Sequence, residues 1–395
     1  MRFRFLLLLL MFLWSVGVLI VILVHPSLRS RQEKEKQSQS LNAIATSGRY
    51  VVTRDDMIDR QLTPTPRFSP SPLSLDRIFS EDHTWIATLA AERVRTVIAT
   101  GDVLLARAVN LRMIRYNNFL WPFEKTADIL RSADITVINL ETPLIKNCPV
   151  TAEGMIFCGD QRNVEGLVFS GVDVVNIANN HMGNWGQEGV DDTVAILSAG
   201  DLTPVGHVNP VYANGGNKPA DAEAMAGKGD TEGMKFAFLG YNDVGKQTGI
   251  RHVDDGTFED DIRLAKKNAD IVFVSFHWGV EYTHKPTGRQ IDIAHRTIDA
   301  GADLVIGNHP HWVQPPEIYQ GKLIVYSHGN FIFDQMWSQK TREGIVGRYT
   351  FYDETLIDAE FLPVIIEDFG QPRWANDEEK RIMDEITNVS ITSTL

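Results

Sequence analysis

Hydrophobic residues are arranged differently in the two parts of this chain, and the change lies near Val94. From there, short continuous runs of β-branched and aromatic residues alternate with longer segments in which apolar residues recur at helical spacing. Continuous apolar runs are typical of strands that are covered on both faces of a sheet. The runs predict strands at Val94–Ala99, Ile135–Asn139, Val172–Ala178, Lys235–Gly240, Ile271–Phe276, Leu304–Gly307 and Leu323–Tyr326.

The segments between these runs predict helices. Gly200 and Gly301 directly follow two of them, as C-terminal helix stops do. The predicted helices cover Phe123–Arg131, Val164–Ser170, Gln187–Ser198, Phe258–Asn268 and Arg289–Ala300, and a further helix-like segment covers Asp377–Asn388. Strands and helices that alternate in this way predict an α/β domain with buried sheets, which we expect over residues 93–395.

Before this region, Phe5–Val24 is a run of twenty residues without a charge. At about 1.5 Å per residue, a helix of this length crosses the hydrocarbon core of a bilayer. The run ends in Val24-His25-Pro26, whereas a cleaved signal peptide has a shorter apolar stretch and small residues before the cut. We therefore expect residues 1–4 to be a short cytoplasmic segment and residues 5–24 to be a retained transmembrane signal anchor.

The sequence indicates only indirectly on which side of the membrane the α/β domain lies. Lys and Arg flank the apolar run on both sides, so their count does not support a cytoplasmic N-terminus. Cys148 and Cys158 are the only cysteines, and a disulfide between them would persist only in an oxidising compartment, while two free buried thiols are the alternative. We expect a single-pass protein of the cell membrane with an extracytoplasmic main domain.

The segment after the apolar run has the composition of a stalk. Arg31–Ser40 is charged and rich in Gln and Ser, and Gln61–Asp76 contains four prolines among Ser and Thr. Such segments bury too little apolar surface to offset their conformational entropy, and proline keeps them extended. The composition predicts a flexible Pro/Ser-rich stalk over residues 25–92.

The net negative charge of the chain argues against nucleic acid as a partner. The formal net charge of the chain is −13, and because the first 60 residues carry +4, the remainder carries −17. Nucleic-acid binding requires a basic face, so an acidic body of this kind argues against it. The body also exerts no long-range attraction on an anionic polymer.

Polar side chains follow six of the seven predicted strands. Ligand sites of α/β sheets form outside the carboxyl ends of the strands, so these side chains are expected to meet. They stand in Gly101-Asp102, Asn139-Leu140-Glu141, Asn179-Asn180-His181, His277-Trp278-Gly279, Asn308-His309-Pro310-His311 and His328-Gly329-Asn330. Each residue alone has a plain structural explanation, such as a helix cap for Asp102 or a turn for Asn180.

The residue types in this set suit a divalent transition metal. Imidazole nitrogen together with carboxylate and carboxamide oxygen favours Mn, Fe or Zn over Ca or Mg. The spacing of His309 and His311 around Pro310 can direct two imidazoles toward neighbouring ions. Two ions about 3.5–4 Å apart would hold a phosphoryl group and activate a water. We therefore expect one or two metal ions at these strand ends.

The same residues carry a family resemblance. The ordered motifs are Gly101-Asp102-Val103-Leu104-Leu105, Asn139-Leu140-Glu141, Ala178-Asn179-Asn180-His181, Phe238-Leu239-Gly240-Tyr241, His277-Trp278-Gly279-Val280-Glu281-Tyr282, the run from Gly301 to His311, and Gly329-Asn330-Phe331-Ile332-Phe333-Asp334-Gln335. From about Val94 to the C-terminus the chain resembles the CapA family of bacterial capsule-synthesis proteins, which is also named for poly-γ-glutamate synthesis. The resemblance implies a calcineurin-like metallophosphoesterase fold, a layered α/β sandwich of two central sheets flanked by helices, behind a membrane anchor.

The resemblance also implies roles for individual residues. His181 would be the catalytic residue that stabilises charge on the leaving group or protonates it. The metal ligands would be Asp102, Glu141, Asn180, His277, His309 and His311, and the substrate pocket would be lined by Asn139, Trp278, Glu281 and Asn330. Simple packing is the alternative for Trp278. The chain departs from ordinary metallophosphoesterases because Val103 and Leu104 follow Asp102, where those enzymes have Asp-x-His, so one metal would lack its usual imidazole.

Three functions from different classes are compatible with these features. The first is a membrane-anchored component of capsule or poly-γ-glutamate synthesis or export, which acts beside membrane-bound polymer synthetase subunits on an anionic capsular polymer. The second is a metal-dependent hydrolase of a phosphoester or of the polymer itself. The third is a non-catalytic polymer-binding protein, which would need a metal or a local basic patch because its body is acidic. The expected partners are thus the bilayer through residues 5–24, the synthetase subunits and the polymer, with no nucleic acid.

Overall fold

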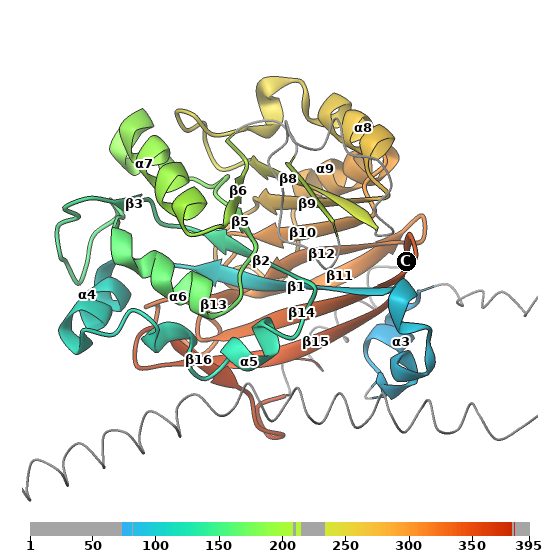
Figure 1. Ribbon diagram of the computed structural model, residues 1–395, viewed down its shortest axis with the longest axis horizontal. Coiled ribbons are helices and arrows are strands. Elements are labelled where there is room, and N and C mark those ends of the chain that lie inside the picture. The colour runs from blue at the N-terminus through green and yellow to red at the C-terminus, as the bar shows by residue number, and fades with distance from the viewer. Residues whose placement is uncertain (1–72, 81, 208–210, 215–233, 381–382, 384–395) are drawn as a thin grey trace, which may run out of the picture. The chain divides into compact units, whose positions relative to one another are not determined.

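Two mixed β-sheets stack against each other in the computed structural model, and helices cover their outer faces (Figure 1). The structure describes residues 73–80, 82–207, 211–214, 234–380 and 383. The expected anchor at residues 5–24 therefore lies outside the described residues, as does most of the helix-like segment Asp377–Asn388. Among the described residues, no helix has the length and apolar character needed to cross a membrane.

The first sheet has eight strands in the order β16-β15-β14-β1-β2-β5-β6, with β13 paired to β1. Its strands β1, β2, β5 and β6 are parallel, and β14, β15 and β16 extend it as an antiparallel edge. The bounds are β1 Val94–Val103, β2 Ile135–Leu140, β5 Val174–Asn176, β6 Thr203–Val205, β13 Asn330–Ile332, β14 Glu343–Tyr352, β15 Thr355–Glu367 and β16 Gln371–Trp374.

The second sheet has six strands in the order β11-β12-β10-β9-β8-β7. Its four central strands are parallel, and the edge strands β7 and β11 are antiparallel to their neighbours. The bounds are β7 Val211–Asn214, β8 Lys235–Asn242, β9 Ile271–His277, β10 Leu304–Asn308, β11 Val313–Tyr319 and β12 Lys322–His328, and a separate pair is formed by β3 Leu144–Ile145 and β4 Gly159–Asp160. All seven strands predicted from continuous apolar runs are present.

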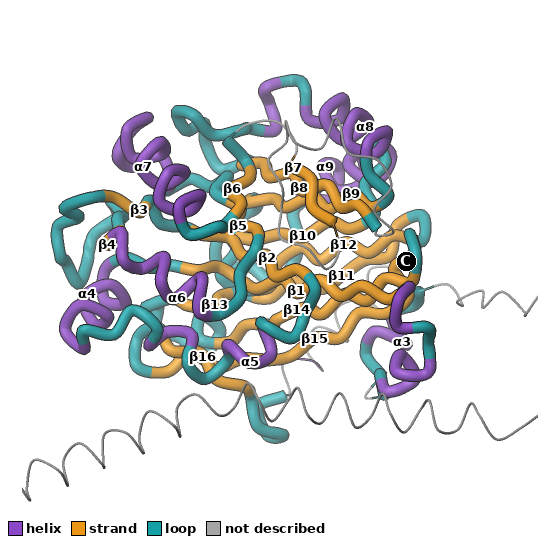
Figure 2. The backbone as a smooth tube through the Cα atoms, in the orientation of Figure 1, coloured by secondary structure: helices purple, strands orange, loops and turns teal. Residues whose placement is uncertain are grey.

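Apart from the short helix Leu75–Ile78, whose Ile78 is buried between the sheets, the helices divide between the two outer faces (Figure 2). Thr287 caps the N-terminus of α9 through a reciprocal capping box with Gln290, which satisfies two backbone N–H groups. The helices are α3 Leu75–Ile78, α4 Arg107–Tyr116, α5 Ala127–Leu130, α6 Val164–Phe169, α7 Gly186–Ala199, α8 Phe258–Asn268 and α9 Gly288–Asp299. The helix expected over Phe123–Arg131 is wrong in its extent, because a 3₁₀ turn at Trp121–Phe123 precedes the single turn of α5.

Three layers of apolar side chains hold this arrangement together. Val97 and Val137 of the first sheet pack with Phe238 and Ile306 of the second in one core between the sheets. A second core lies between the first sheet and helices α4 to α7, and a third lies between the second sheet and helices α8 and α9. The chain thus forms a layered α/β sandwich with two sheets flanked by helices.

The folded part begins earlier than the stalk boundary expected at residue 92. Leu73 and Ile78 are buried in the core between the sheets. The His83 Nδ1 atom lies 2.7 Å from the Asp358 carboxylate of β15. Residues 73–80 and 82–92 are therefore part of the domain. They directly follow the Pro-rich stretch that ends at Pro72, but a few apolar side chains are enough to attach them to the sheet.

Gly101 allows β1 to approach β13 at the end where Asp102 stands. The backbone N–H of Asp102 donates to the Gly329 carbonyl over 2.9 Å. A Cβ on Gly101 would lie 2.2 Å from that carbonyl oxygen, closer than real Cβ atoms approach an oxygen. The side chain of residue 101 must therefore be absent for these two strands to meet.

We expect Gly101→Ala to destabilise the domain by about 2 kcal/mol or more, because backbone must move to relieve the clash. Gly288→Ala at the start of α9 is the matched control, since its Cβ would meet nothing within 4 Å. The control should change stability by no more than about 0.5 kcal/mol. Urea unfolding of the two variants measures both values, and equal stabilities would contradict the close approach.

Candidate metal centre

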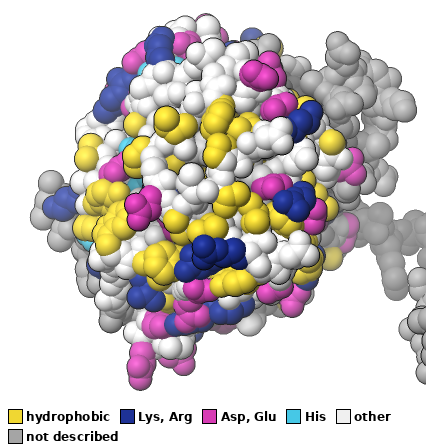
Figure 3. All heavy atoms as spheres, turned by 90° about the vertical axis from the view of Figure 1, so that its left-hand side faces the viewer, with side chains coloured by type: hydrophobic (Ala, Val, Ile, Leu, Met, Phe, Trp, Pro, Cys, Tyr) yellow, Lys and Arg dark blue, Asp and Glu magenta, His cyan; other side chains and the backbone are white. Residues whose placement is uncertain are grey.

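The parallel strands of both sheets end on one side of the domain, and the polar residues singled out in the sequence lie there. In the first sheet, Asp102 of β1 is in register with both Asn139 of β2 and Asn330 of β13. In the second sheet, Asn308 of β10 is in register with His277 of β9. This side corresponds to the left of Figure 1, and Figure 3 views it directly, with hydrophobic side chains gathered among acidic and basic ones.

Five of the six expected metal ligands offer donor atoms in overlapping groups. Within each group the donor atoms lie within 4.8 Å of one another, the spacing of a coordination shell. The groups are Glu141, His277 and His309; Asp102, Glu141 and His311; and Glu281, His309 and His311. The sixth, Asn180, lies beside them with its Oδ1 atom 2.9 Å from His277 Nε2. The groups share residues, so they describe adjacent positions in one centre.

The carboxylate of Glu141 tests whether this centre fits a cation. Glu141 is 1% exposed, and its Oε2 atom has no hydrogen-bond partner. Its Oε1 atom lies 3.7 Å from His181 Nε2 and 3.9 Å from His277 Nε2, beyond hydrogen-bond length. Burial raises the pKa of this carboxyl well above its usual range. An ionised carboxylate here needs a cation, so the residues present fit a metal ion.

Two of the imidazoles are in the form that binds metal. Burial lowers the pKa of His277 well below its usual value and lowers the pKa of His309 to about 3. Both are therefore neutral near pH 7, as metal ligation requires. His311 behaves differently: burial opposes its protonation, but the carboxylates of Glu141 and Asp102 outweigh burial and raise the pKa of the imidazole to about 9.

The turn that carries two of these imidazoles has a strained backbone. His309 and His311 have φ angles of +98° and +57°, which residues with a side chain rarely adopt. The backbone N–H of His309 donates to Asp102 Oδ2 over 3.2 Å, and His311 Nδ1 lies 3.3 Å from the same oxygen. Strain of this kind persists where surrounding contacts hold it and is concentrated at functional sites.

Asn139 and Asn330, both expected to line a pocket, are buried behind the ligands. Asn139 donates to Asp102 Oδ1 over 2.8 Å and is itself held by the amide of Asn176 at 2.9 Å. The Oδ1 atom of Asn330 lies 2.9 Å from His311 Nδ1, and its amide donates to a backbone carbonyl. These two asparagines orient metal-ligand candidates and do not present a surface to a substrate.

Trp278 also differs from the expected pocket residue. It is fully buried, its ring stacks on Phe276 with centroids 4.5 Å apart, and its indole N–H donates to the Tyr326 carbonyl over 2.9 Å. The packing alternative weighed for this residue is therefore the one that the structure shows. Glu281, by contrast, is half-buried and reaches the His309 and His311 group, so it is a candidate ligand as well as a pocket residue.

His181, the expected catalytic residue, lies at the edge of the centre. Its Nε2 atom faces Glu141, and its ring stacks on Phe157 with centroids 3.9 Å apart. Its Nδ1 atom lies 3.3 Å from Asn184 Oδ1. Burial lowers the pKa of this imidazole to about 4, so it is neutral near pH 7.

Sequence reasoning missed the residues that surround His181. Arg107 begins α4 and forms a part-buried ion pair with Asp334. Its guanidinium carbon lies 4.7 Å from the centre of the Phe157 ring. The partners are too far apart in the chain for any local pattern to join them. Of the two alternatives left open for the cysteines, the structure shows the disulfide: Cys148 and Cys158 are bonded, with their Cα atoms 5.8 Å apart.

A second group of possible ligands lies elsewhere among the described residues. Asp243, His252 and Asp254 come within ligand distance of one another. However, the guanidinium of Arg289 pairs with both carboxylates, at 2.6 and 2.9 Å. This group is an ion-pair cluster in which both carboxylates already have a guanidinium partner.

The neutral histidines make the stability of the metal-free protein sensitive to acid. The folded-state pKa of His309, about 3, lies below its unfolded value. The contribution of His309 to the free energy of unfolding is therefore complete above about pH 6.5 and is lost as the pH falls toward 3. Between about pH 6.5 and 4.5 we expect the native chain to lose about 2 kcal/mol more unfolding free energy than His309→Asn. Urea unfolding in a chelator measures this difference.

His295→Asn serves as the control for that comparison. His295 lies outside the centre, part-exposed, with its Nε2 atom 2.9 Å from Glu317. This variant should follow the acid dependence of the native chain. If His309→Asn does the same, His309 is not held neutral by its burial.

Comparison with known proteins agrees with the motifs from which the site is built. The family model described as "Bacterial capsule synthesis protein PGA_cap" matches residues 96–335. The chain is 29% identical over 348 residues to the capsule biosynthesis protein CapA of Bacillus anthracis, covering 82% of each chain. It is 32% identical over 302 residues to the PGA biosynthesis protein CapA of Bacillus subtilis (strain 168), covering 73% of this chain and 77% of that one.

A third relative is a probable polyglutamine synthesis accessory protein of Mycobacterium tuberculosis, 27% identical over 327 residues, with coverage of 74% of this chain and 82% of the relative. The matched residues 96–335 contain every ligand candidate described above. The resemblance inferred from the motifs is thus confirmed, and the chain belongs to the bacterial capsule synthesis (PGA_cap, CapA) family.

Proposed function

We propose that this protein is a membrane-anchored component of capsule or poly-γ-glutamate synthesis or export, and that its extracytoplasmic domain carries a phosphoesterase-like metal centre. The names of its relatives support the process, because two are capsule or PGA biosynthesis proteins. The word "accessory" in the name of the third supports action beside other subunits, for which membrane-bound polymer synthetases are the natural partners. The apolar run at residues 5–24 supports the anchor.

One observation supports the metal centre: carboxylates and imidazoles from several strand ends of two sheets gather around a buried glutamate, one oxygen of which has no hydrogen-bond partner. The donors belong to Asp102, Glu141, His277, His309 and His311, with Asn180 and Glu281 beside them. Nitrogen and oxygen donors without sulfur favour Mn, Fe or Zn. Sheets that bring such residues together at their carboxyl ends are also what a metallophosphoesterase fold requires.

The side chains around the centre have separable tasks. When bound, the metal would polarise a phosphoryl or carbonyl oxygen and lower the pKa of a water. Asn139 and Asn330 hold Asp102 and His311 in place from behind. His181 presents Nε2 next to Glu141, and this nitrogen is where a proton would be taken up or delivered during a reaction.

Hydrolysis of a phosphoester or of the polymer is the second candidate. It is favoured by the position of His181, since a protein that only binds polymer has no need of a buried neutral imidazole at the edge of its metal centre. A binding protein without catalysis is the third candidate. For an acidic body, it too requires the metal to attract an anionic polymer.

Metal content of the purified full chain tests the proposal most directly. We expect one or two transition-metal ions per chain in the native protein and the loss of at least one in the double variant His309→Ala/His311→Ala. His295→Ala, which removes an imidazole outside the centre, should keep the full content. Elemental analysis after loading and dialysis gives the stoichiometry.

The metal-loaded protein is then supplied with phosphodiesters and with γ-linked glutamyl polymer. Turnover that the double variant lacks supports the hydrolase. Binding of polymer that depends on metal, without turnover, supports the third candidate. If the native chain holds no metal under any loading condition, the metal centre is wrong and the protein serves polymer assembly by other means.

A further inference from the structure

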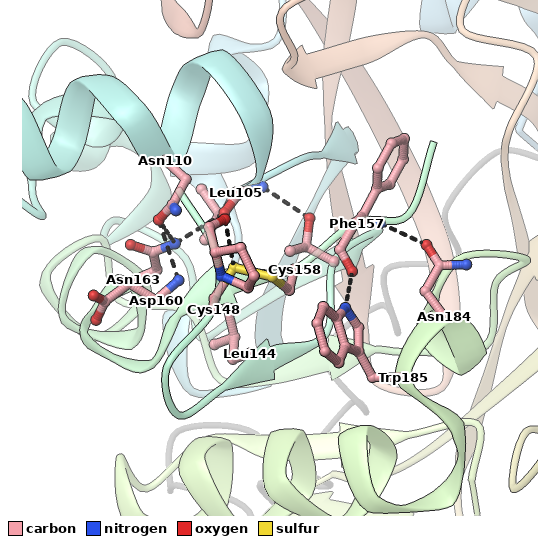
Figure 4. Close-up of a disulfide and its surroundings, with 12 residues drawn as sticks. Leu105, Asn110, Leu144, Cys148, Phe157, Cys158, Asp160, Asn163, Asn184 and Trp185 are labelled. Carbon is pink, nitrogen blue, oxygen red and sulfur yellow. Dashed lines mark hydrogen bonds between the residues drawn. A yellow bond between two sulfur atoms is a disulfide. The ribbon is translucent and has the colours of Figure 1, made fainter. Parts of the chain in front are cut away.

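The disulfide closes a loop whose last residues pack against His181. The loop runs from Cys148 to Cys158, and at its base β3 and β4 pair in parallel register. Outside these short strands it has no regular structure. Figure 4 shows the disulfide with Phe157, Asn184 and Trp185 beside it. The loop therefore depends on a covalent bond and a few side-chain contacts for its position.

Those contacts concentrate on Phe157, the residue before Cys158. The Trp185 indole donates to the Phe157 carbonyl over 3.0 Å. The Phe157 ring contacts the Arg107 guanidinium, and it also stacks on the His181 ring with the two planes inclined by only 22°. Arg107 also donates to the Gly154 carbonyl of the same loop over 3.3 Å. The backbone and ring of Phe157 are thus both fixed.

The backbone of Phe157 determines how the amide of Asn184 is oriented. The Phe157 N–H donates to Asn184 Oδ1 over 2.7 Å. A backbone N–H can only donate, so the atom facing it must be the amide oxygen and not the NH₂ group. The same oxygen lies 3.3 Å from His181 Nδ1. An oxygen of this kind only accepts, so Nδ1 of the neutral imidazole must carry the hydrogen.

It follows that Nε2 of His181 has the lone pair. This nitrogen faces Glu141 Oε1 at 3.7 Å, on the side of the metal centre. In a neutral imidazole only one nitrogen carries a hydrogen, and the hydrogen bond made by the other decides which. The position of the loop therefore fixes the orientation of the Asn184 amide, and this amide fixes the tautomer of His181. The tautomer in turn makes Nε2 the proton-accepting nitrogen at the centre.

We infer that the loop closed by Cys148 and Cys158 positions His181: through Phe157 and Asn184 it holds the imidazole as the Nδ1–H tautomer with Nε2 directed at the metal centre. Phe157 and Asn184 are positioning residues in this scheme, because neither supplies the proton. The catalytic meaning rests on the proposed function, whereas the tautomer does not. His181 then adopts this tautomer and orientation only when the disulfide has formed.

Nitrogen-15 spectroscopy of histidine-labelled full chain, freed of metal by a chelator near neutral pH, tests the inference. The His181 signals are assigned by their absence in His181→Gln. In the oxidised native chain we expect Nδ1 to resonate as a protonated nitrogen and Nε2 as an unprotonated one. In Cys148→Ser/Cys158→Ser and in Asn184→Ala we expect Nδ1 to shift toward the unprotonated position, as the tautomers mix.

Ile156→Ser is the matched control within the loop. Ile156 is next to Phe157 but 71% exposed, so its replacement leaves the disulfide and the Asn184 contact in place. It should keep the native His181 signals. Asn184→Ala keeps the disulfide, so it distinguishes a specific effect on the tautomer from loosening of the loop as a whole. The inference is overturned if His181 is the Nε2–H tautomer in the native chain, or if both test variants keep the native signals.

Activity gives a second readout once a substrate is found. A displaced His181 should lower kcat for a phosphodiester by about tenfold in the disulfide variant, with KM and bound metal unchanged. If no substrate is ever turned over, the hydrolase proposal fails while the tautomer result stands. If turnover is found and the disulfide variant matches the native chain in kcat and tautomer, the positioning role fails and the hydrolase remains.

Discussion

The carboxylate of Glu141 is the group on which the arrangement of this site depends. A carboxylate with a buried, unpartnered oxygen is unfavourable by several kcal/mol unless a positive charge lies close to it. The nearest side chains are imidazoles, and two of them, His277 and His309, are neutral because their own burial lowers their pKa values. His311, which the carboxylates keep protonated, supplies one positive charge, and the neutral imidazoles leave nitrogen lone pairs that a metal ion could use.

The residues around Glu141 come from both sheets, so the geometry of the centre depends on how the two sheets are placed against each other. Asp102 reaches the centre only because Gly101 lets β1 pass against Gly329, and His309 is held there by its N–H bond to Asp102. The first contact joins two strands of one sheet, and the second joins one sheet to the other. A metal ion at this place would therefore bridge the sheets across the end of their shared apolar core, and binding would stabilise the domain as well as supply its chemistry.

Sequence reasoning identified the buried strands β1, β2, β5, β8, β9, β10 and β12, because buried parallel strands are local signals. It missed the long antiparallel strands β14 and β15. Runs such as Ile271–Phe276 are apolar whichever strand lies beside them, and the polar residue after each run marks its end. Contacts between residues far apart in the chain have no such local signal in the sequence. The ion pair of Arg107 with Asp334 and the packing of Trp278 under Tyr326 depend on the fold alone. Strand β11 was missed because it contains Pro315 and Pro316, which an edge strand tolerates and a central strand does not.

The centre is preorganised in two different ways, and the difference bears on how the protein works. The metal-ligand candidates stand on strand ends and strained turns that the sheets hold rigidly. His181 follows the short strand β5, and its orientation depends instead on a loop of irregular structure that a disulfide closes. Because the tautomer of His181 is set by a backbone N–H of that loop, a covalent bond near the surface reaches the proton chemistry of the centre through only two residues, Phe157 and Asn184. In the proposed function, metal binding and proton transfer can thus be lost independently, since the ligand candidates and His181 are held by different parts of the structure.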